Sequence, residues 1–350
     1  MKNFLSIQEC SAMRALAILS IMLHNYTHWL PNIVKENEFT YRQERNTQFW
    51  QALQLYNDDF LLHIMSYLGH YGVIIFLFLS GFGVVMKYEK GNISEIKTWS
   101  FIRYNYLKLW RIFIVGFIAF VLIDAITKRM HFYSFTDVVA MLGLFGNLLD
   151  SPSQSIWPGP YWYFGITLQL YVIYCLILYR YRYWGIPLLL IIICWLWQSY
   201  YIGDHQVITY LRYNFVGGIL PFCIGILLAR FVKEFALNQF IWFAIFLISV
   251  AAILALCFTF QGWLWAPVFV IIAMLALIKV LSHQTISFLT KVGNISAAIF
   301  IMHPIARKIF IFTEYSNSNV YAGLLLYVVA SIGLAWVAQK IIEQLPNPKL

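Results

Sequence analysis

The first apolar stretch of the chain decides the fold class, because it carries charged and titratable groups inside a run long enough to cross a bilayer. It reads Cys10-Ser11-Ala12-Met13-Arg14-Ala15-Leu16-Ala17-Ile18-Leu19-Ser20-Ile21-Met22-Leu23-His24-Asn25-Tyr26-Thr27-His28-Trp29-Leu30. An arginine at the centre of a membrane helix costs about 2.5–3.5 kcal/mol on insertion scales. A chain that keeps Arg14, His24 and His28 in one such helix is expected to turn them toward a protein interior or a watery cavity. The default hypothesis is therefore a functional site within the membrane.

The composition is that of a polytopic membrane protein. Of its 350 residues, 61% are hydrophobic and 11% are charged, and the mean hydropathy is +0.71. Soluble domains carry about 25% charged residues. The aromatic residues make up 19% of the chain, and many of them flank apolar runs, as anchors at the membrane interface do.

The net charge of +9 does not indicate nucleic-acid binding. The basic residues lie in short loops between apolar segments, where membrane topology explains them. Four of the five cysteines lie within apolar runs and none shows paired spacing, so they are expected to be buried free thiols. No small-residue cleavage site precedes His24, which predicts an uncleaved first helix.

Ten segments approach the length of about 20 residues that a helix needs to cross the hydrocarbon. They span residues 11–30, 70–86, 108–126, 161–179, 184–202, 214–231, 240–260, 263–281, 294–312 and 320–341. Their apolar residues do not alternate with polar ones as in β-barrel strands. The sequence therefore predicts an all-α protein of about ten transmembrane helices, in a single domain over residues 1–350. A shorter run at 136–149 is expected to form an interfacial or re-entrant helix.

The loop charges predict the orientation. With the N-terminus inside, most Lys and Arg residues fall on the cytoplasmic side, so both termini are expected to be cytoplasmic. Two outer loops, at 31–69 and 127–160, are long. Such loops are either binding loops or solvated connections, and the sequence leaves both readings open.

The first segment offers groups for proton transfer and anion binding. His24 and His28 are four residues apart and share a helix face, and the rise from Arg14 to His24 is about 15 Å. A histidine suits a general base near neutral pH, and an arginine presents a planar fork to phosphate or carboxylate. Alternatively, the Arg14 side chain extends to the membrane interface and only helps to set the topology, and each histidine only forms a hydrogen bond to a neighbouring helix. The two histidines alone are a poor metal site, since no carboxylate or third ligand accompanies them.

Four further motifs carry polar groups. The run Gly72–Gly83 contains Ser80 among small residues that also permit close helix packing. Arg103, Lys108 and Arg111 follow in a basic stretch that suits either phosphate binding or a positive-inside signal. The later motifs are Gln169 and Tyr171 in the segment at 161–179, and His303-Pro304, where the proline is expected to kink the helix.

In this order the motifs resemble those of acyltransferase family 3, the multi-spanning membrane acyltransferases that modify cell-surface glycans. The resemblance covers roughly residues 6–340 and rests on five sets of residues. These are Arg14-Ala15-Leu16-Ala17-Ile18 with a later histidine, Gly72-Val73 through Phe76 to Ser80-Gly81-Phe82, Lys108-Leu109-Trp110, Trp162 with Gln169 and Tyr171, and His303-Pro304.

Two features depart from the family pattern. One residue fewer than usual separates Arg14 from His24, so the strict spacing places Asn25 at the position of the histidine. A helix turns by about −80° over ten residues and by about −40° over fourteen, which brings His28 nearer to the Arg14 face than His24. The choice between the two histidines therefore stays open. Lys108 stands where an arginine is usual, which keeps the charge and loses the bidentate fork.

The resemblance implies transfer of an acyl group from acyl-CoA, commonly acetyl-CoA, to a hydroxyl of a glycan or lipid-linked sugar. It implies that Arg14, Arg103, Lys108 and Arg111 bind the CoA phosphates, and that His24 or His28 acts as the base or briefly carries the acyl group. The predicted oxyanion or substrate-positioning residues are Ser80, Gln169, Tyr171 and His303. The protein would lie among the lipids of a bacterial inner membrane.

A transporter of an anion or an acylated lipid is the alternative from another class. Ten helices with buried Arg, His and Gln side chains suit such a role as well. Transporters often show internal repeats with paired broken helices, and the sequence shows no repeat. An enzyme would release a covalently changed product, whereas a transporter would move its substrate unchanged.

Overall fold

The computed structural model describes residues 3–91, 96–311 and 319–349, and within these ranges the chain is helical with no β-strand. An isolated β-bridge joins Asn3 to Lys233. The α-helices are α1 (Ile7–Thr27), α2 (Gln43–Gln54), α3 (Phe60–Leu68), α4 (Gly72–Tyr88), α5 (Thr98–Ile126), α6 (Phe135–Leu142), α7 (Pro152–Ser155), α8 (Trp162–Ile173), α9 (Gly185–Tyr200), α10 (His205–Tyr213), α11 (Phe215–Phe231), α12 (Gln239–Leu256), α13 (Phe260–Val280), α14 (His283–Asn294), α15 (Ser296–Phe310) and α17 (Val320–Gln344). Short 3-10 turns are η1 (Gly69–Tyr71), η2 (Gly146–Leu148) and η3 (Gly159–Tyr161), and a π-helical turn, η4 (Tyr174–Leu178), follows α8.

Among the described residues, six helices are long and apolar enough to cross a membrane, and the number rises to eight if each of two bent pairs is one span. The bent pairs are α10 with α11, at 47°, and α14 with α15, at 64°. All ten predicted segments overlap helices. Helices α1 and α9 lie outside the set of six to eight, since α1 carries several polar groups and α9 has only 16 residues. The all-α class is confirmed, and the number of about ten spans stays a prediction.

The two long loops contain more helix than the sequence indicated. Helix α3 leads through η1 into α4, which forms one apolar stretch over Phe60–Tyr88. The predicted segment at 70–86 was therefore too short, because the polar residues around α3 masked its apolar face. The run at 136–149 forms the short helix α6 and the turn η2.

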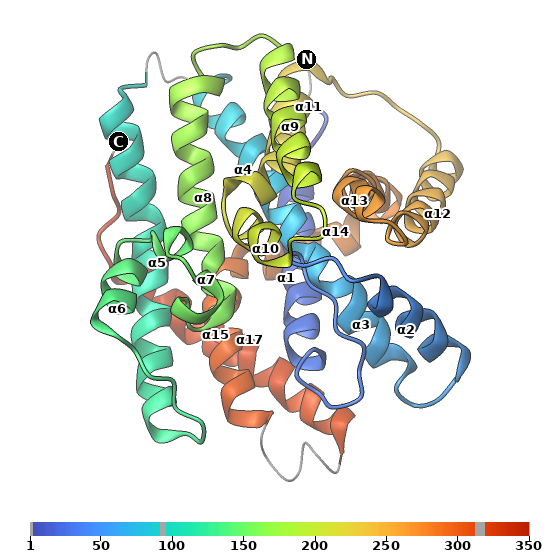
Figure 1. Ribbon diagram of the computed structural model, residues 1–350. Helices are drawn as coiled ribbons and strands as arrows, with labels where there is room; N and C mark the ends of the chain where they lie inside the picture. The colour runs from blue at the N-terminus through green and yellow to red at the C-terminus, as the bar shows by residue number, and fades with distance from the viewer. Residues whose placement is uncertain (1–2, 92–95, 312–318, 350) are drawn as a thin grey trace.

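Helix α1 begins at a capping box, in which the Ser6 hydroxyl accepts from the Glu9 backbone amide and the Glu9 carboxylate accepts from the Ser6 backbone amide. It then runs through the interior of the bundle, where it packs against α3, α4, α14 and α15 (Figure 1). Small residues permit this contact: a Cβ atom at Gly72 would lie 2.3 Å from the Ala17 carbonyl oxygen. The predicted functional helix is thus a central helix of the fold.

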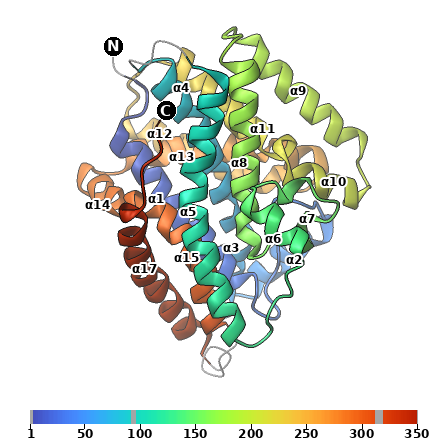
Figure 2. The ribbon, with the colours of Figure 1, turned by 90° about the vertical axis from the view of Figure 1, so that its left-hand side faces the viewer.

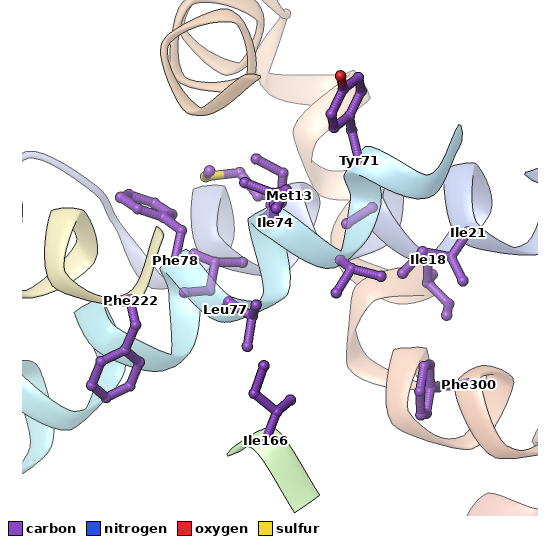
Figure 3. Close-up of a cluster of buried hydrophobic side chains, with 14 of the residues drawn as sticks. Met13, Ile18, Ile21, Tyr71, Ile74, Leu77, Phe78, Ile166, Phe222 and Phe300 are labelled. Atoms are coloured by element: carbon purple, nitrogen blue, oxygen red, sulfur yellow. The ribbon is translucent and has the colours of Figure 1, made fainter. Parts of the chain in front are cut away.

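Helix α4 is the second central element. Within its membrane stretch 78% of residues are buried, against 17% for α12. Figure 3 shows Leu77 of α4 pointing toward Ile166 of α8, with Phe222 of α11 close to Phe78. A Cβ atom at Gly81 would lie 2.0 Å from the Phe222 carbonyl oxygen, as the small-residue motif predicted. At Gly83 nothing lies within 4 Å of such an atom, so this second glycine serves no helix contact.

The outer helices expose large apolar side chains, which indicates a surface that faces lipid rather than water. The exposed residues gather on α9, α12 and α17: Leu189, Ile192, Ile193, Leu196, Phe240, Phe243, Leu247, Ile248, Leu325, Val329, Trp336 and Val337. These helices surround α1 and α4. The two ends of the chain lie toward the same end of the bundle (Figures 1 and 2).

Two further predictions concern single residues. The five cysteines are free and buried, as expected. Helix α15 continues through Pro304, and the bend of 64° lies before it, where Ile295 separates α14 from α15. The one bend recorded for this pair of helices thus precedes the proline, and the kink expected at Pro304 itself stays a prediction.

Candidate functional site

Two cavities lie inside the bundle, and each has a volume of about 300 Å³. The histidine cavity is lined by His24, His28 and His70 together with Arg307, Tyr163 and residues of the two long loops. The arginine cavity is lined by Arg14, Lys87, Lys108, Ser80, Tyr171 and neighbouring residues. The predicted residues Arg14 and His24 thus belong to one helix and two different cavities.

His24 is held in one orientation. Its Nδ1 atom lies 2.8 Å from the carbonyl oxygen of Ser66 in α3. Because a carbonyl oxygen only accepts, Nδ1–H donates this bond and Nε2 is left as the proton acceptor of the ring. A Cβ atom at Gly69 would lie 2.6 Å from the His24 Cβ atom, so the turn η1 packs directly against the histidine. The hydrogen bond and the close packing together hold His24 in the tautomer that is protonated at Nδ1 and can accept a proton at Nε2.

His28 and His70 complete a cluster of three imidazoles. The His24 ring centroid lies 4.9 Å from that of His28 and 5.7 Å from that of His70. The Nδ1 atom of His28 and both ring nitrogens of His70 have no hydrogen-bond partner among the described residues. Both histidines line the histidine cavity, and these nitrogens are themselves buried. Sequence reasoning missed His70, and its position immediately before the motif that begins at Gly72 was the one signal.

Asn25, which the family spacing places where a histidine is usual, has a structural role. Its Nδ2 atom donates to the Ile21 carbonyl oxygen at 3.0 Å, and its Oδ1 atom accepts from Arg307 Nη1 at 3.0 Å. Arg307 lies in α15 with its guanidinium 4.8 Å from the Trp29 ring centroid. Arg307 was also missed, because its segment was singled out for His303 instead.

The long loops supply an aromatic and acidic wall to the histidine cavity. Phe39 packs edge-on to Trp162 and stacks on Tyr213, with ring centroids 4.9 and 4.0 Å apart. Glu38 is beside it, and the guanidinium of Arg212 donates to the main-chain carbonyl oxygen of Glu38. Burial raises the pKa of the Glu38 carboxyl to about 7, although the Arg212 charge opposes this shift.

The arginine cavity combines three cationic side chains with hydroxyl groups. Arg14 of α1, Lys87 of α4 and Lys108 of α5 line it, and Lys87 Nζ donates to the Tyr104 hydroxyl at 2.8 Å. Among the described residues that line this cavity, none is acidic. Such a cavity attracts an anion with several charges.

The structure leaves other predicted residues outside both cavities. The exposed Arg103 lines neither one. The Arg111 guanidinium donates to the Ile342 carbonyl oxygen and to Asn347, at the end of α17. The Gln169 amide donates to Asn214 Oδ1 at 2.8 Å and accepts from the Phe215 backbone amide at 2.9 Å.

His303 is fully buried and lines neither cavity. Its Nδ1 atom lies 3.2 Å from the Ile299 carbonyl oxygen, one turn earlier in the same helix. Among the described residues, no group of three or more His, Cys, Asp or Glu side chains is arranged to hold a metal ion.

The chain matches the acyltransferase 3 family model, described as an acyltransferase domain, over residues 8–340, and it belongs to that family. The resemblance seen in the sequence motifs is confirmed. No curated protein and no solved structure matches the chain significantly.

Proposed function

We propose that this membrane acyltransferase moves an acyl group, commonly acetyl, from acyl-CoA to a hydroxyl of a cell-surface glycan or lipid-linked sugar. The single observation that carries the proposal is the placement of both cavities along α1, with Arg14 in one and His24 in the other. The rise of about 15 Å between these residues separates a phosphate site from a base. This separation suits a donor whose charged end and thioester lie far apart.

The arginine cavity is the proposed donor site. Arg14, Lys87 and Lys108 would bind the CoA phosphates, since cationic side chains without an acidic neighbour favour phosphate oxygens. Arg103 and Arg111 stand outside this site. The cavity is lined by Arg14 of α1, by the second half of α4 and by Asn105 and Lys108 of α5. We assign this end of the bundle to the cytoplasmic side of a bacterial inner membrane, in agreement with the predicted loop charges.

The histidine cavity is the proposed acceptor site. Its aromatic residues Trp29, Trp157 and Phe39 offer flat apolar faces for a sugar ring, and Asn37 and Glu38 offer groups for its hydroxyls. Trp157, Phe39, Asn37 and Glu38 come from the loops at 31–69 and 127–160, and Trp29 follows the end of α1. The position of these side chains in the cavity favours the binding-loop interpretation over that of inert connections.

In the proposed reaction, His24 Nε2 accepts the proton of the acceptor hydroxyl while the oxygen attacks the thioester carbonyl carbon. The tetrahedral intermediate collapses as the carbon–sulfur bond breaks, and the imidazolium returns the proton to the thiolate of CoA. Ser80 and Tyr171, which line the donor cavity, are the candidates among the predicted oxyanion donors.

The purified protein in nanodiscs tests this proposal with labelled acetyl-CoA and surface glycans of the host as acceptor. We expect label on the glycan with the wild type and a loss of transfer in His24→Ala. The exposed His283 supplies the matched control, and His283→Ala should retain full transfer. Normal transfer by His24→Ala would move the base to His28, which a parallel His28→Ala variant would show.

A transporter remains the second candidate, and one observation favours it. The bends of 47° and 64° in the α10–α11 and α14–α15 pairs resemble the broken helices that line transport sites. A flux assay in proteoliposomes separates the two functions. Movement of an unchanged anion or acylated lipid, with no label on any acceptor, would support transport and overturn the enzyme.

A further inference from the structure

The two cavities follow the same faces of α1 and α4. On α1, Arg14 lines the arginine cavity and Ile21 and His24 line the histidine cavity. On α4, Val73 lines the histidine cavity, and Ser80 lines the arginine cavity two turns later. Residues seven apart in a helix lie close to one stripe, so both helices pass from one cavity to the other along a continuous face.

One side chain contacts residues that line both cavities and so forms part of the wall between them. Tyr163 of α8 lines the histidine cavity, and its hydroxyl oxygen lies 3.3 Å from the Ser80 Oγ atom, where the two share a hydrogen bond. Its ring packs edge-on to Phe76, with centroids 6.1 Å apart, and Phe76 and Ser80 both line the arginine cavity. On another side the Tyr163 ring packs against Phe300, with centroids 5.4 Å apart.

The chemistry of this wall differs from that of a permanent core contact. The two ring contacts are apolar, whereas the hydrogen bond to Ser80 is a polar tie between α8 and α4. Tyr163 is half-buried, so part of its surface faces cavity space. Rotation of one side chain about its Cα–Cβ bond would break that tie and open the wall without moving a helix.

We propose that Tyr163 is the partition through which the acyl group reaches the histidine cavity, and that its ring limits the length of the acyl chain transferred. This inference rests on the proposed acyl-transfer function. Tyr163 forms no covalent bond in it. The Tyr163 ring contacts Phe76 on one side and Phe300 on another, so each further methylene of the acyl chain must displace aromatic carbon.

The first test compares acetyl-, butyryl- and hexanoyl-CoA as donors for the wild type and Tyr163→Ala. We expect Tyr163→Ala to raise the ratio of kcat/KM for butyryl-CoA to that for acetyl-CoA by about tenfold, the scale set by one or two methylenes in an apolar pocket. Tyr163→Phe and Ser80→Ala remove the hydrogen bond and keep the ring, and they should change the ratio by about twofold.

The matched control is Phe39→Ala, which enlarges the histidine cavity at its loop wall rather than at the partition. An equal change of the donor ratio in Phe39→Ala would show that cavity volume alone sets chain length, and would overturn the inference. An unchanged ratio in Tyr163→Ala would overturn it as well.

A second readout is independent of catalysis. Val73 lines the histidine cavity and the native cysteines are buried, so Val73→Cys provides a thiol behind the partition. In sealed proteoliposomes, an impermeant thiol reagent on the side of the arginine cavity should label Val73→Cys several-fold faster when Tyr163→Ala is also present. Equal labelling rates would overturn the partition. Absence of transfer from every donor, with faster labelling in the double variant, would instead overturn only the proposed function.

Discussion

The histidine cavity and the arginine cavity have the same volume and share three helices, α1, α4 and α8, yet they differ in the parts of the chain that complete them. The arginine cavity takes its cations from α1, α4 and α5, all within helices. The histidine cavity adds Glu38 and Trp157 from the long loops to the imidazoles of α1 and η1. The comparison teaches that the proposed donor site takes its cations from the helical bundle, whereas the proposed acceptor site takes part of its wall from the loops.

Distorting the imidazole cluster should have the largest effect. In Gly69→Ala the new methyl group would lie 2.6 Å from His24 Cβ and 2.7 Å from the Ser20 carbonyl oxygen, so α1 and η1 must separate. Misplacement of a catalytic group by about 1 Å costs about 100-fold in rate. We expect a loss of that size in kcat, measured by transfer of labelled acetyl groups in nanodiscs.

The control is Gly333→Ala in α17, where nothing lies within 4 Å of a new Cβ atom. It should keep full activity, with unchanged or slightly higher thermal stability, because alanine favours the helix. Full activity in Gly69→Ala would show that the position of His24 does not matter and would remove the histidine cavity from catalysis.

Removal of a positive charge from the arginine cavity tests the comparison from its other side. Lys108→Ala should raise the KM for acyl-CoA by about tenfold at low salt, because one charge-assisted hydrogen bond to phosphate is lost. The effect should shrink as ionic strength rises. Measurement of transfer rates against donor concentration at two salt levels checks both statements.

Arg111→Ala is the matched variant from the same basic stretch. Its guanidinium bonds the Ile342 carbonyl oxygen at the end of α17, so its loss should lower thermal stability and leave the KM for acyl-CoA unchanged. An increase of KM in Arg111→Ala equal to that in Lys108→Ala would restore Arg111 to the donor site.

The smallest predicted effect is a pH dependence of the histidine cavity. Burial raises the pKa of Glu38 from an ordinary 4.5 to about 7. The protonated form is therefore favoured in the fold, and the associated stability is present below pH 4.5 and lost as the pH rises to about 7. The KM for the acceptor should change a few-fold between about pH 6 and pH 8.

Glu38→Gln carries a neutral amide at every pH, and its acceptor KM should vary less over this range, as measured by transfer at saturating donor. Glu36→Gln is the control: burial also raises the pKa of Glu36 to about 7, but its carboxylate bonds Arg45 and it does not line the cavity. A flat wild-type profile would exclude Glu38 from acceptor binding.

The sequence predicted the helices well because apolar runs in a membrane protein have one main interpretation. It missed the continuation of α3 into α4 and the short helices α10 and α14 that precede the bends at Asn214 and Ile295, since these depend on tertiary contacts. The Asn214 break shows the reason. The Asn214 carboxamide accepts from Gln169 and donates to the Asn147 carbonyl oxygen, and both partners lie far away in sequence.

The candidate site was predictable in part for the same physical reason. Arg14 and His24 were conspicuous because a charged or titratable group is costly within an apolar run. Lys87 was assigned to topology because it lies at the end of its segment. Glu38 and Tyr163 were missed, since a carboxylate in a polar loop and a tyrosine at an aromatic-rich helix start show no distinguishing pattern.

The central claim is that one helix, α1, carries the side chain that binds the phosphates of the acyl donor in one cavity and the general base in the other. Steady-state transfer from acetyl-CoA by the wild type, Arg14→Ala and His24→Ala tests it most directly. The account predicts that Arg14→Ala raises the donor KM by about tenfold with kcat largely retained. His24→Ala should lower kcat by about 100-fold or more with the donor KM retained. A change of the same kinetic constant, either the donor KM or kcat, in both variants would contradict the division of roles between the cavities. Normal turnover in His24→Ala would contradict it as well.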